Sequence, residues 1–223
     1  MSTSSQDYFA SVASQWDDIR AGYFTDQMRD AAILKAGLPE AALVADIGTG
    51  TGFVAAGLAP RVGRVFGFDA SAEMLTVARR NLAAFPNVRL RQSSGDAIQL
   101  PDGLLDGVFA NMYLHHAPDP MKAIAEMARL LKPGGVLCIT DLDMHDHEWQ
   151  RDQMADLWLG FDRQQIRDWF AQVGLTQVDV DCAEGTCNAC GPDGNVQPLS
   201  IFVAIGRKPW VYPPARAGGA SAP

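Results

Sequence analysis

Histidine side chains occur in two close pairs along this chain, His115 with His116 and His145 with His147, and Asp141 lies just before the second pair. Imidazole and carboxylate groups can take a proton from a substrate or anchor it. The pattern therefore makes His115, His145 and Asp141 candidates for a general base or a substrate anchor. We assign His116 a structural role, because only one of two adjacent histidines is expected to point into a pocket.

Cysteine is the other residue type with reactive chemistry. Cys182, Cys187 and Cys190 match part of a plant-type ferredoxin spacing, but the fourth cysteine, Cys138, lies upstream in a predicted buried strand. Three other interpretations stay open: a zinc site that includes a histidine, thiols that bind a thiophilic substrate such as trivalent arsenic, and side chains that merely pack. The sequence leaves open whether a metal is bound.

The stretch Val44–Gly52 is an apolar run that breaks into three alternating glycines. This pattern predicts a buried strand, a tight turn and, from Phe53, a helix. A dinucleotide-binding turn would carry its third glycine at the position of Phe53. Asp46 disfavours a nearby phosphate, whereas its charge attracts an amino group and a sulfonium. The turn therefore indicates S-adenosylmethionine as the ligand.

A second apolar run, Arg64–Asp69, also ends in an acid. An acid at the end of the second strand is placed to bind both hydroxyls of a ribose. The alternative is that Asp69 caps a helix that begins near Ser71. The glycine turn upstream favours the ribose interpretation.

Strand and helix patterns alternate from residue 43 onward, which predicts an α/β fold with a parallel sheet and helices on both of its faces. Strands are predicted near 43–47, 64–69, 88–93, 105–112, 135–142, 175–181 and 199–205. Helices are predicted near 52–60, 71–84, 119–131 and 162–173. A loop at 182–198 joins the last two strands. Because ligands bind beyond the carboxyl ends of parallel strands, we expect the histidines and the loop cysteines to gather at that edge.

Three parts of the chain are distinguished by composition. Residues 1–38 carry helical patterns and predict a lid over the cofactor, with a layer that only covers the sheet as the alternative. Within it, Tyr23 and Trp16 either close over the cofactor or pack in the core. Residues 39–208 form the predicted main domain, and residues 209–223, rich in proline, glycine and alanine, form a predicted disordered tail.

Composition also limits the partners. The formal net charge is −8, and an acidic chain lacks the phosphate-neutralising surface on which nucleic-acid affinity depends. No apolar run approaches the roughly 20 residues that span a bilayer, and the first residues lack the pattern of a secretory signal. We therefore expect a cytoplasmic protein with a small-molecule substrate, no nucleic acid and no membrane. The oligomeric state cannot be inferred from the sequence.

Taken together, five motifs within residues 40–208 resemble those of class I S-adenosylmethionine-dependent methyltransferases. They are Asp46–Gly52, Gly67–Asp69, Gly95–Ala97, Asn111–His116 and Leu131–Gly135. The resemblance implies a Rossmann-like, seven-stranded sheet in the order 3-2-1-4-5-7-6, with the last strand antiparallel.

The resemblance also implies the cofactor contacts. The glycines would line the methionine part, Asp69 would hold the ribose, Asp96 would reach the adenine amine, and two apolar side chains would pack on the adenine ring. The full implied set is Asp46, Gly48, Thr49, Gly50, Gly52, Asp69, Ala70, Met74, Gly95, Asp96, Ala97 and Asn111.

Three stretches suggest a narrower placement within this family. Leu114–Pro120 resembles the branch that contains quinone-biosynthesis and arsenite methyltransferases. Asp141–Trp149 and Trp158–Phe161 resemble the methyltransferase halves fused to arsenical-repressor-type regulators, although no winged helix is present here. The family's usual cysteine upstream of Cys138 is absent.

The resulting prediction is an enzyme that transfers the methyl group of S-adenosylmethionine to a small-molecule acceptor by in-line displacement, leaving S-adenosylhomocysteine. One alternative is methylation of arsenite held by Cys182, Cys187 and Cys190. The other is a protein that binds S-adenosylmethionine without turnover. Tyr23 and the three cysteines are the predicted substrate contacts.

Overall fold

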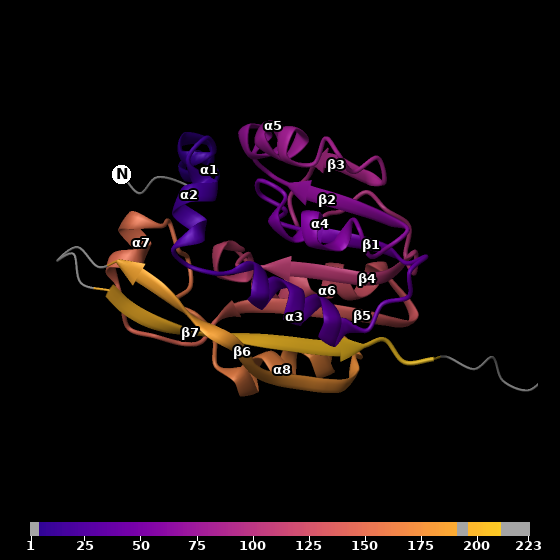
Figure 1. Cartoon of the computed structure of the whole chain (residues 1–223). Helices are drawn as coiled ribbons and strands as arrows, with labels where there is room; N and C mark the ends of the chain where they lie inside the picture. Colours follow the sequence, from indigo (N-terminus) through magenta and orange to yellow (C-terminus); the bar gives the residue numbers. More distant parts are fainter. Residues whose placement is uncertain (1–4, 191–195, 211–223) are drawn as a thin grey trace, which may run out of the picture.

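The protein is built on a seven-stranded sheet in the order β3-β2-β1-β4-β5-β7-β6, seen in a computed structural model that describes residues 5–190 and 196–210 (Figure 1). Strands β1 to β5 pair in parallel, and β7 runs antiparallel to both of its neighbours. The predicted fold class and strand order are confirmed. The strands are β1 Leu43–Ile47, β2 Arg64–Asp69, β3 Val88–Gln92, β4 Leu105–Asn111, β5 Leu131–Leu142, β6 Thr176–Cys190 and β7 Val196–Arg207.

Helices cover both faces of the sheet (Figure 1). They are α1 Ser5–Val12, α2 Trp16–Ala21, α3 Asp26–Ala36, α4 Phe53–Leu58, α5 Ala72–Asn81, the short 3₁₀ helix η1 Leu114–His116, α6 Pro120–Leu130, α7 Trp149–Gln153 and α8 Arg163–Gln172. None of the helices in the described ranges is long and apolar enough to cross a bilayer.

The core has one apolar layer on each face of the sheet. Val44 of β1 packs in the same layer as Ile33 of α3, whereas Ile47 of β1 belongs to the opposite layer, with Ile124 of α6 and Phe170 of α8. Parallel strands covered on both faces need apolar residues at nearly every position. This requirement explains why the strand signal in the sequence was a continuous apolar run.

The parallel strands bring distant segments to one edge. β1, β2, β4 and β5 end at Ile47, Asp69, Asn111 and Leu142. The segments that follow these strands therefore lie side by side along the carboxyl edge of the sheet. In the order of the strands they are the start of α5 after β2, the glycine turn after β1, η1 after β4 and residues 143–148 after β5. Figure 1 shows α1, α2 and α7 at this same edge.

Two expected boundaries are wrong. Residues 182–190 and 196–198, predicted as loop, are strand, because β6 and β7 continue as an antiparallel ladder out to the pair Cys190–Val196, with a shift in register between Cys182 and Thr186. β5 begins at Leu131, since Leu131 already pairs with Leu105. The tail predicted from residue 209 stays a prediction: Trp210 lies close to Gly134 and is largely exposed, and residues 211–223 lie outside the described part.

The N-terminal helices divide between two roles. α3 covers the sheet and buries Met28, Ile33 and Ala36. Thr25 caps its start by accepting a hydrogen bond from the backbone N–H of Met28 at 3.3 Å. α1 and α2 instead reach the carboxyl edge of the sheet, where their side chains border a cavity.

Candidate functional site

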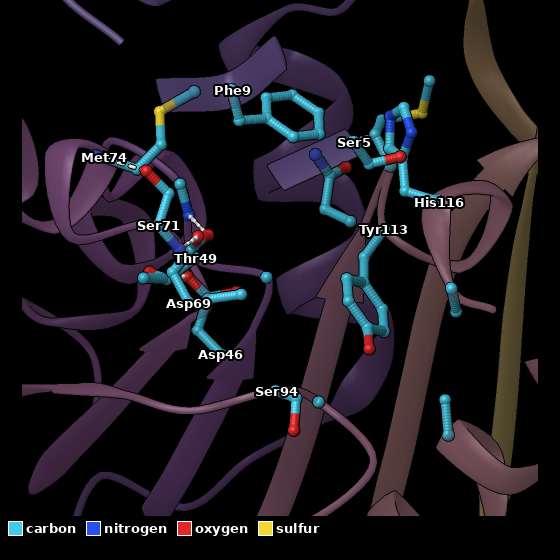
Figure 2. A pocket seen from close by; sticks show the side chains of 18 of the residues that line it. Ser5, Phe9, Asp46, Thr49, Asp69, Ser71, Met74, Ser94, Tyr113 and His116 are labelled. Carbon is cyan, nitrogen blue, oxygen red and sulfur yellow. Dashed lines mark hydrogen bonds between the residues drawn. The ribbon is translucent and has the colours of Figure 1, made fainter. Parts of the chain in front are cut away.

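A cavity of about 660 Å³ opens at the carboxyl edge of the sheet, and we call it the larger cavity. Figure 2 shows Asp46, Asp69 and Ser71 on one side of it and Tyr113 and His116 on the other. Residues of α1 and α2 complete its wall. A volume of this order fits a drug-sized ligand.

The glycine turn forms one end of the larger cavity. Gly48, Gly50 and Gly52 have φ of +68°, +54° and +94°, which side chains rarely allow. A Cβ at Gly48 would lie 2.5 Å from the Tyr113 ring. Gly52 does not border the cavity, since a Cβ there would meet Leu82. The turn thus presents bare backbone to a ligand at Gly48 and Gly50.

Asp46 is a buried carboxylate beneath the turn, 1% exposed. A single oxygen, Oδ2, accepts hydrogen bonds from Thr49 Oγ1 at 2.6 Å and from the Ala55 N–H at 3.1 Å. Burial raises the pKa of Asp46 to about 7, although these hydrogen bonds oppose the rise. A positively charged ligand beside it would favour the ionised form.

Asp69 joins the turn to the second strand. Its carboxylate accepts hydrogen bonds from the backbone N–H groups of Gly50 and Ser71, both at 2.8 Å. Burial raises the pKa of Asp69 above its ordinary value. The Ser71 hydroxyl, which accepts from Met74 N–H at 3.1 Å, is the cap of α5. The helix-cap interpretation of Asp69 is therefore wrong, and its carboxylate borders the larger cavity.

The implied adenine contacts are only partly gathered. Ala70, Met74, Gly95 and Asp96 border the larger cavity, but Ala97 is exposed and does not. Asp96 pairs with Lys122 Nζ at 2.7 Å, and this hydrogen bond lowers the pKa of Asp96. Asn111 also borders the cavity and accepts a hydrogen bond from Thr140 Oγ1 at 2.6 Å.

Tyr113 is a wall residue that the sequence analysis did not single out. Its ring lies against Gly48 and Gly95, so a Cβ at either glycine would collide with it. Burial raises the pKa of the Tyr113 hydroxyl. Its place inside the Asn111–His116 motif was the available signal.

The carboxylate of Asp141 is fully buried and holds the first histidine in place. Asp141 Oδ1 lies 2.6 Å from His115 Nδ1, and Oδ2 accepts the N–H of Leu114 at 2.8 Å. Burial alone would lower the pKa of His115, but the charges of Asp141 and Asp156 outweigh it and raise the pKa to about 9. The raised pKa disfavours His115 as a general base at neutral pH and favours the role of an anchor.

His116 and Asp156 complete this cluster. His116 Nδ1 and His115 Nε2 each lie 3.8 Å from Asp156 Oδ1. Burial, followed by the charge of His115, holds the pKa of His116 well below its ordinary value. Burial also raises the pKa of Asp156 to about 6. His116, to which we assigned a structural role, borders the larger cavity, whereas His115 does not.

Beside the larger cavity is a second one of about 30 Å³, which we call the smaller cavity. It is bordered by His115, His116, Asp156 and Tyr23. Residues of α2 and of the segment around α7 complete its wall. The hydroxyls of Tyr23 and Tyr8 donate hydrogen bonds to Met154 Sδ at 3.6 and 3.4 Å. The predicted placement of Tyr23 near the substrate is consistent with this geometry.

The remaining predicted groups lie elsewhere. His145 borders neither cavity and stacks on His147 at 5.3 Å, and burial lowers its pKa to about 4. Cys182 is exposed on β6, again outside both cavities, and Cys138 is buried in β5. The side chains of Cys187 and Cys190 lie outside the described part, so their predicted role is untested.

Arg20 of α2 is a further residue that the sequence analysis missed, and it borders both cavities. Its guanidinium lies over the Phe53 ring at 4.0 Å. Its buried Nε has no hydrogen-bond partner among the described residues and is 3.7 Å from Asp17. Asp17 also accepts a hydrogen bond from Thr51 Oγ1 at 2.6 Å, which ties α2 to the glycine turn.

The fold and the glycine turn define a class of protein, the S-adenosylmethionine-dependent methyltransferases. Residues 45–139 match the family model described as a methyltransferase domain. The chain therefore carries a methyltransferase domain of this class, and S-adenosylmethionine is the cofactor that the class uses.

Individual relatives support the same class. The chain is 31% identical over 166 residues to 2-methyl-6-phytyl-1,4-hydroquinone methyltransferase 1, chloroplastic, of Oryza sativa subsp. japonica, which covers 73% of this chain and 50% of that protein. It is 39% identical over 129 residues to trans-aconitate 2-methyltransferase of Azoarcus sp. (strain BH72), covering 56% of this chain and 49% of that one. The chain spans about half the length of these curated relatives.

Among solved structures, the YcgJ protein from Bacillus subtilis superimposes with a TM-score of 0.70 at 20% identity, covering 84% of this chain and all of that one. At this identity the match supports the fold alone.

Proposed function

We propose that this protein transfers the methyl group of S-adenosylmethionine to a small-molecule acceptor. The observation that carries the proposal is the larger cavity, which extends from the glycine turn and Asp69 to Tyr113 and His116. We infer that the cofactor would occupy the end at the glycine turn and the acceptor the other end.

At the cofactor end, Asp69 is suited to hold the ribose. Its carboxylate accepts two backbone N–H groups, from Gly50 and Ser71. An ionised carboxylate offers about four acceptor positions, so capacity is left for two ribose hydroxyls. The two backbone bonds fix the carboxylate before the cofactor arrives, which lowers the entropy cost of binding.

Arg20 is suited to the carboxylate of the methionine part. Its guanidinium lies over Phe53, the residue that directly follows the glycine turn. Its Nε is buried and unbonded within the described residues, and burial lowers the pKa of Arg20. Arg20 is partly buried and its Nε lies 3.7 Å from Asp17, so a carboxylate with two oxygens can still accept hydrogen bonds from the guanidinium.

At the acceptor end, the rings of His115 and His116 border the smaller cavity. We propose an acceptor with an acidic oxygen, which an imidazole N–H at this end can hold by a hydrogen bond. In the reaction, an electron pair of the acceptor bonds to the methyl carbon while the carbon–sulfur bond breaks and its electrons return to sulfur. The chain's task is to align these three atoms and exclude water.

We assign α1 and α2 the role of a lid, within the predicted segment 1–38. Phe9 and Trp16 border the larger cavity, and the Asp17–Thr51 hydrogen bond closes α2 onto the turn. Asp17 also accepts a hydrogen bond from Asn81 Nδ2 at 2.9 Å, and Ser5 of α1 donates one to the Ala155 carbonyl at 2.8 Å, so several contacts hold the lid closed.

The arsenite alternative lacks comparable support. Cys182 is exposed and away from both cavities, and the other two thiols lie outside the described part. The metalloid proposal therefore stands on the sequence spacing alone.

Calorimetry with S-adenosylmethionine tests the cofactor assignment. We expect a micromolar dissociation constant for the unmodified chain, at least tenfold weaker binding for Asp69→Ala, and no change for the control Glu40→Gln, which removes an exposed charge. Unchanged binding by Asp69→Ala would contradict the ribose assignment.

Transfer itself is measured with a radiolabelled methyl group and a panel of hydroquinones and polycarboxylates. Labelled product with any member supports the proposal. If a chain saturated with cofactor labels none of them, while binding remains tight, the alternative of binding without turnover is favoured.

A further inference from the structure

Three metal-binding side chains converge on the wall of the smaller cavity. His115, His116 and Asp156 each offer a ligand atom, and these atoms lie within 4.8 Å of one another. Both ring nitrogens that face Asp156 Oδ1 are 3.8 Å from it. This separation is too long for a hydrogen bond.

Asp156 is the residue that points to a missing ligand. Its side chain is 2% exposed, and Oδ1 has no hydrogen-bond partner among the described residues. A buried carboxylate oxygen without a partner costs free energy unless something binds it. The imidazoles of His115 and His116 face this oxygen without reaching it, and His116 Nδ1 lies 3.3 Å from the Ala155 carbonyl oxygen.

His115 is already oriented as a metal ligand would be. Its Nδ1 is held by Asp141 Oδ1 at 2.6 Å, so Nε2 is the nitrogen that faces Asp156. Metal-bound histidines characteristically donate their second ring N–H to a carboxylate, which fixes the tautomer and the ring plane. Asp141 is itself fixed by the backbone N–H groups of Leu114 and Leu142.

We propose that His115, His116 and Asp156 bind a divalent transition ion of the zinc type. Zinc accepts histidine nitrogen and carboxylate oxygen at about 2.0–2.2 Å, so two ligands of a tetrahedral ion are roughly 3.4 Å apart. The observed 3.8 Å requires a contraction of a few tenths of an ångström. Two histidines and one carboxylate leave a coordination position open, as catalytic zinc and iron sites do.

The ion would border the smaller cavity, beside Tyr23 and Met154. Its positive charge would face the acceptor. This role rests on the proposed methyl transfer, whereas the binding of the ion does not. The acceptor class that fits is an oxygen donor such as a phenol, an enol or a carboxylic acid.

Metal titration of the full chain tests the site. After treatment with a chelator and its removal, we expect one Zn²⁺ per chain by calorimetry, and visible absorption bands when Co²⁺ replaces it. Asp156→Asn should weaken binding at least tenfold, with His116→Ala as a second variant if the first fails to fold. The control Asp152→Asn, an exposed acid on α7, should bind as the unmodified chain does.

Two results would overturn the proposal. One is the absence of stoichiometric Zn²⁺ or Co²⁺ binding to folded protein. The other is binding that survives Asp156→Asn and His116→Ala but disappears in His147→Ala, which would place the ion at the stacked pair His145–His147. Because S-adenosylmethionine binding is measured separately, failure of the metal site is distinguishable from failure of the proposed function.

Discussion

Replacing Asp46 by asparagine should make this protein more stable and, at the same time, a poorer binder of its cofactor. Thr49 Oγ1 and Ala55 N–H both donate to the same oxygen, Oδ2. An asparagine whose carbonyl oxygen takes that position keeps both hydrogen bonds. The substitution therefore removes a buried charge and little else.

The magnitude follows from the pKa of Asp46, which burial raises from 3.8 to about 7. A carboxyl group whose pKa is higher in the folded state contributes stability below its unfolded pKa, and this contribution is lost as the pH rises through the folded value. About 3 pKa units correspond to about 4 kcal/mol above pH 7, of which roughly 2 to 3 kcal/mol is lost between pH 5 and pH 8.

Urea unfolding followed by tryptophan fluorescence measures this loss. The unmodified chain and Asp46→Asn should differ little near pH 4, and the variant should be more stable by a few kcal/mol at pH 8. Comparing the two curves cancels the other titrating groups. If the variant keeps the pH slope of the unmodified chain, or is less stable at pH 8, the assigned burial of an ionisable Asp46 is wrong.

The same variant should bind S-adenosylmethionine more weakly, because the charge opposite the sulfonium and amino groups is gone. A charge-assisted contact is worth about 1.5–3 kcal/mol, so the expected loss of affinity is roughly 10- to 100-fold. Calorimetry at pH 8 checks it, and equal affinity would mean that Asp46 does not face the positive part of the cofactor.

Three further predictions follow from particular contacts. Gly48→Ala should reduce S-adenosylmethionine affinity at least tenfold, because the added Cβ would lie 2.5 Å from the Tyr113 ring. The control Gly174→Ala has φ +79° and open space around it, so in thermal unfolding it should show only the cost of the strained backbone. Arg20→Ala should weaken binding of S-adenosylmethionine about tenfold but leave binding of its decarboxylated analogue unchanged in calorimetry, and an equal loss for both would refute the carboxylate contact. Arg129→Met should lower the free energy of unfolding by about 2 kcal/mol in urea titrations, because Arg129 donates hydrogen bonds to two carboxylates and two backbone carbonyls. A change within about 0.5 kcal/mol is typical of a surface residue without such contacts and would contradict this prediction.

The fold was accessible from the sequence because its signals are local. Apolar runs and the glycine turn predicted the strands of a parallel α/β fold, and the acid at the end of the second strand predicted the placement of Asp69 at the cavity. The strand order was implied by the resemblance to the methyltransferase family. The strands predicted at 175–181 and 199–205 correspond to β6 and β7, but their extension was not accessible, because residues 182–190 and 196–198 carry mostly small and polar side chains without a strand pattern. The strand conformation of these two segments depends on their pairing with each other.

The site was only partly predictable for the same reason. Asp141 lies near the end of β5 and His115 follows the neighbouring strand β4, so their meeting could be expected from topology. Asp156 follows α7 without any regular pattern, and no spacing signals that it lies 3.8 Å from both histidines. Arg20 likewise reads as a surface residue of an amphipathic helix until α2 is seen against the turn.

By itself, then, the sequence determined the sheet, the cofactor turn and the chemical types that could reach the acceptor. The tertiary structure decided which of the two adjacent histidines borders the larger cavity, that His145 borders neither cavity, and that a buried carboxylate completes the cluster. The repeat of apolar residues along a helix or strand specifies which of its faces is buried. The direction of a single polar side chain depends instead on its neighbours, which come from segments remote in the sequence.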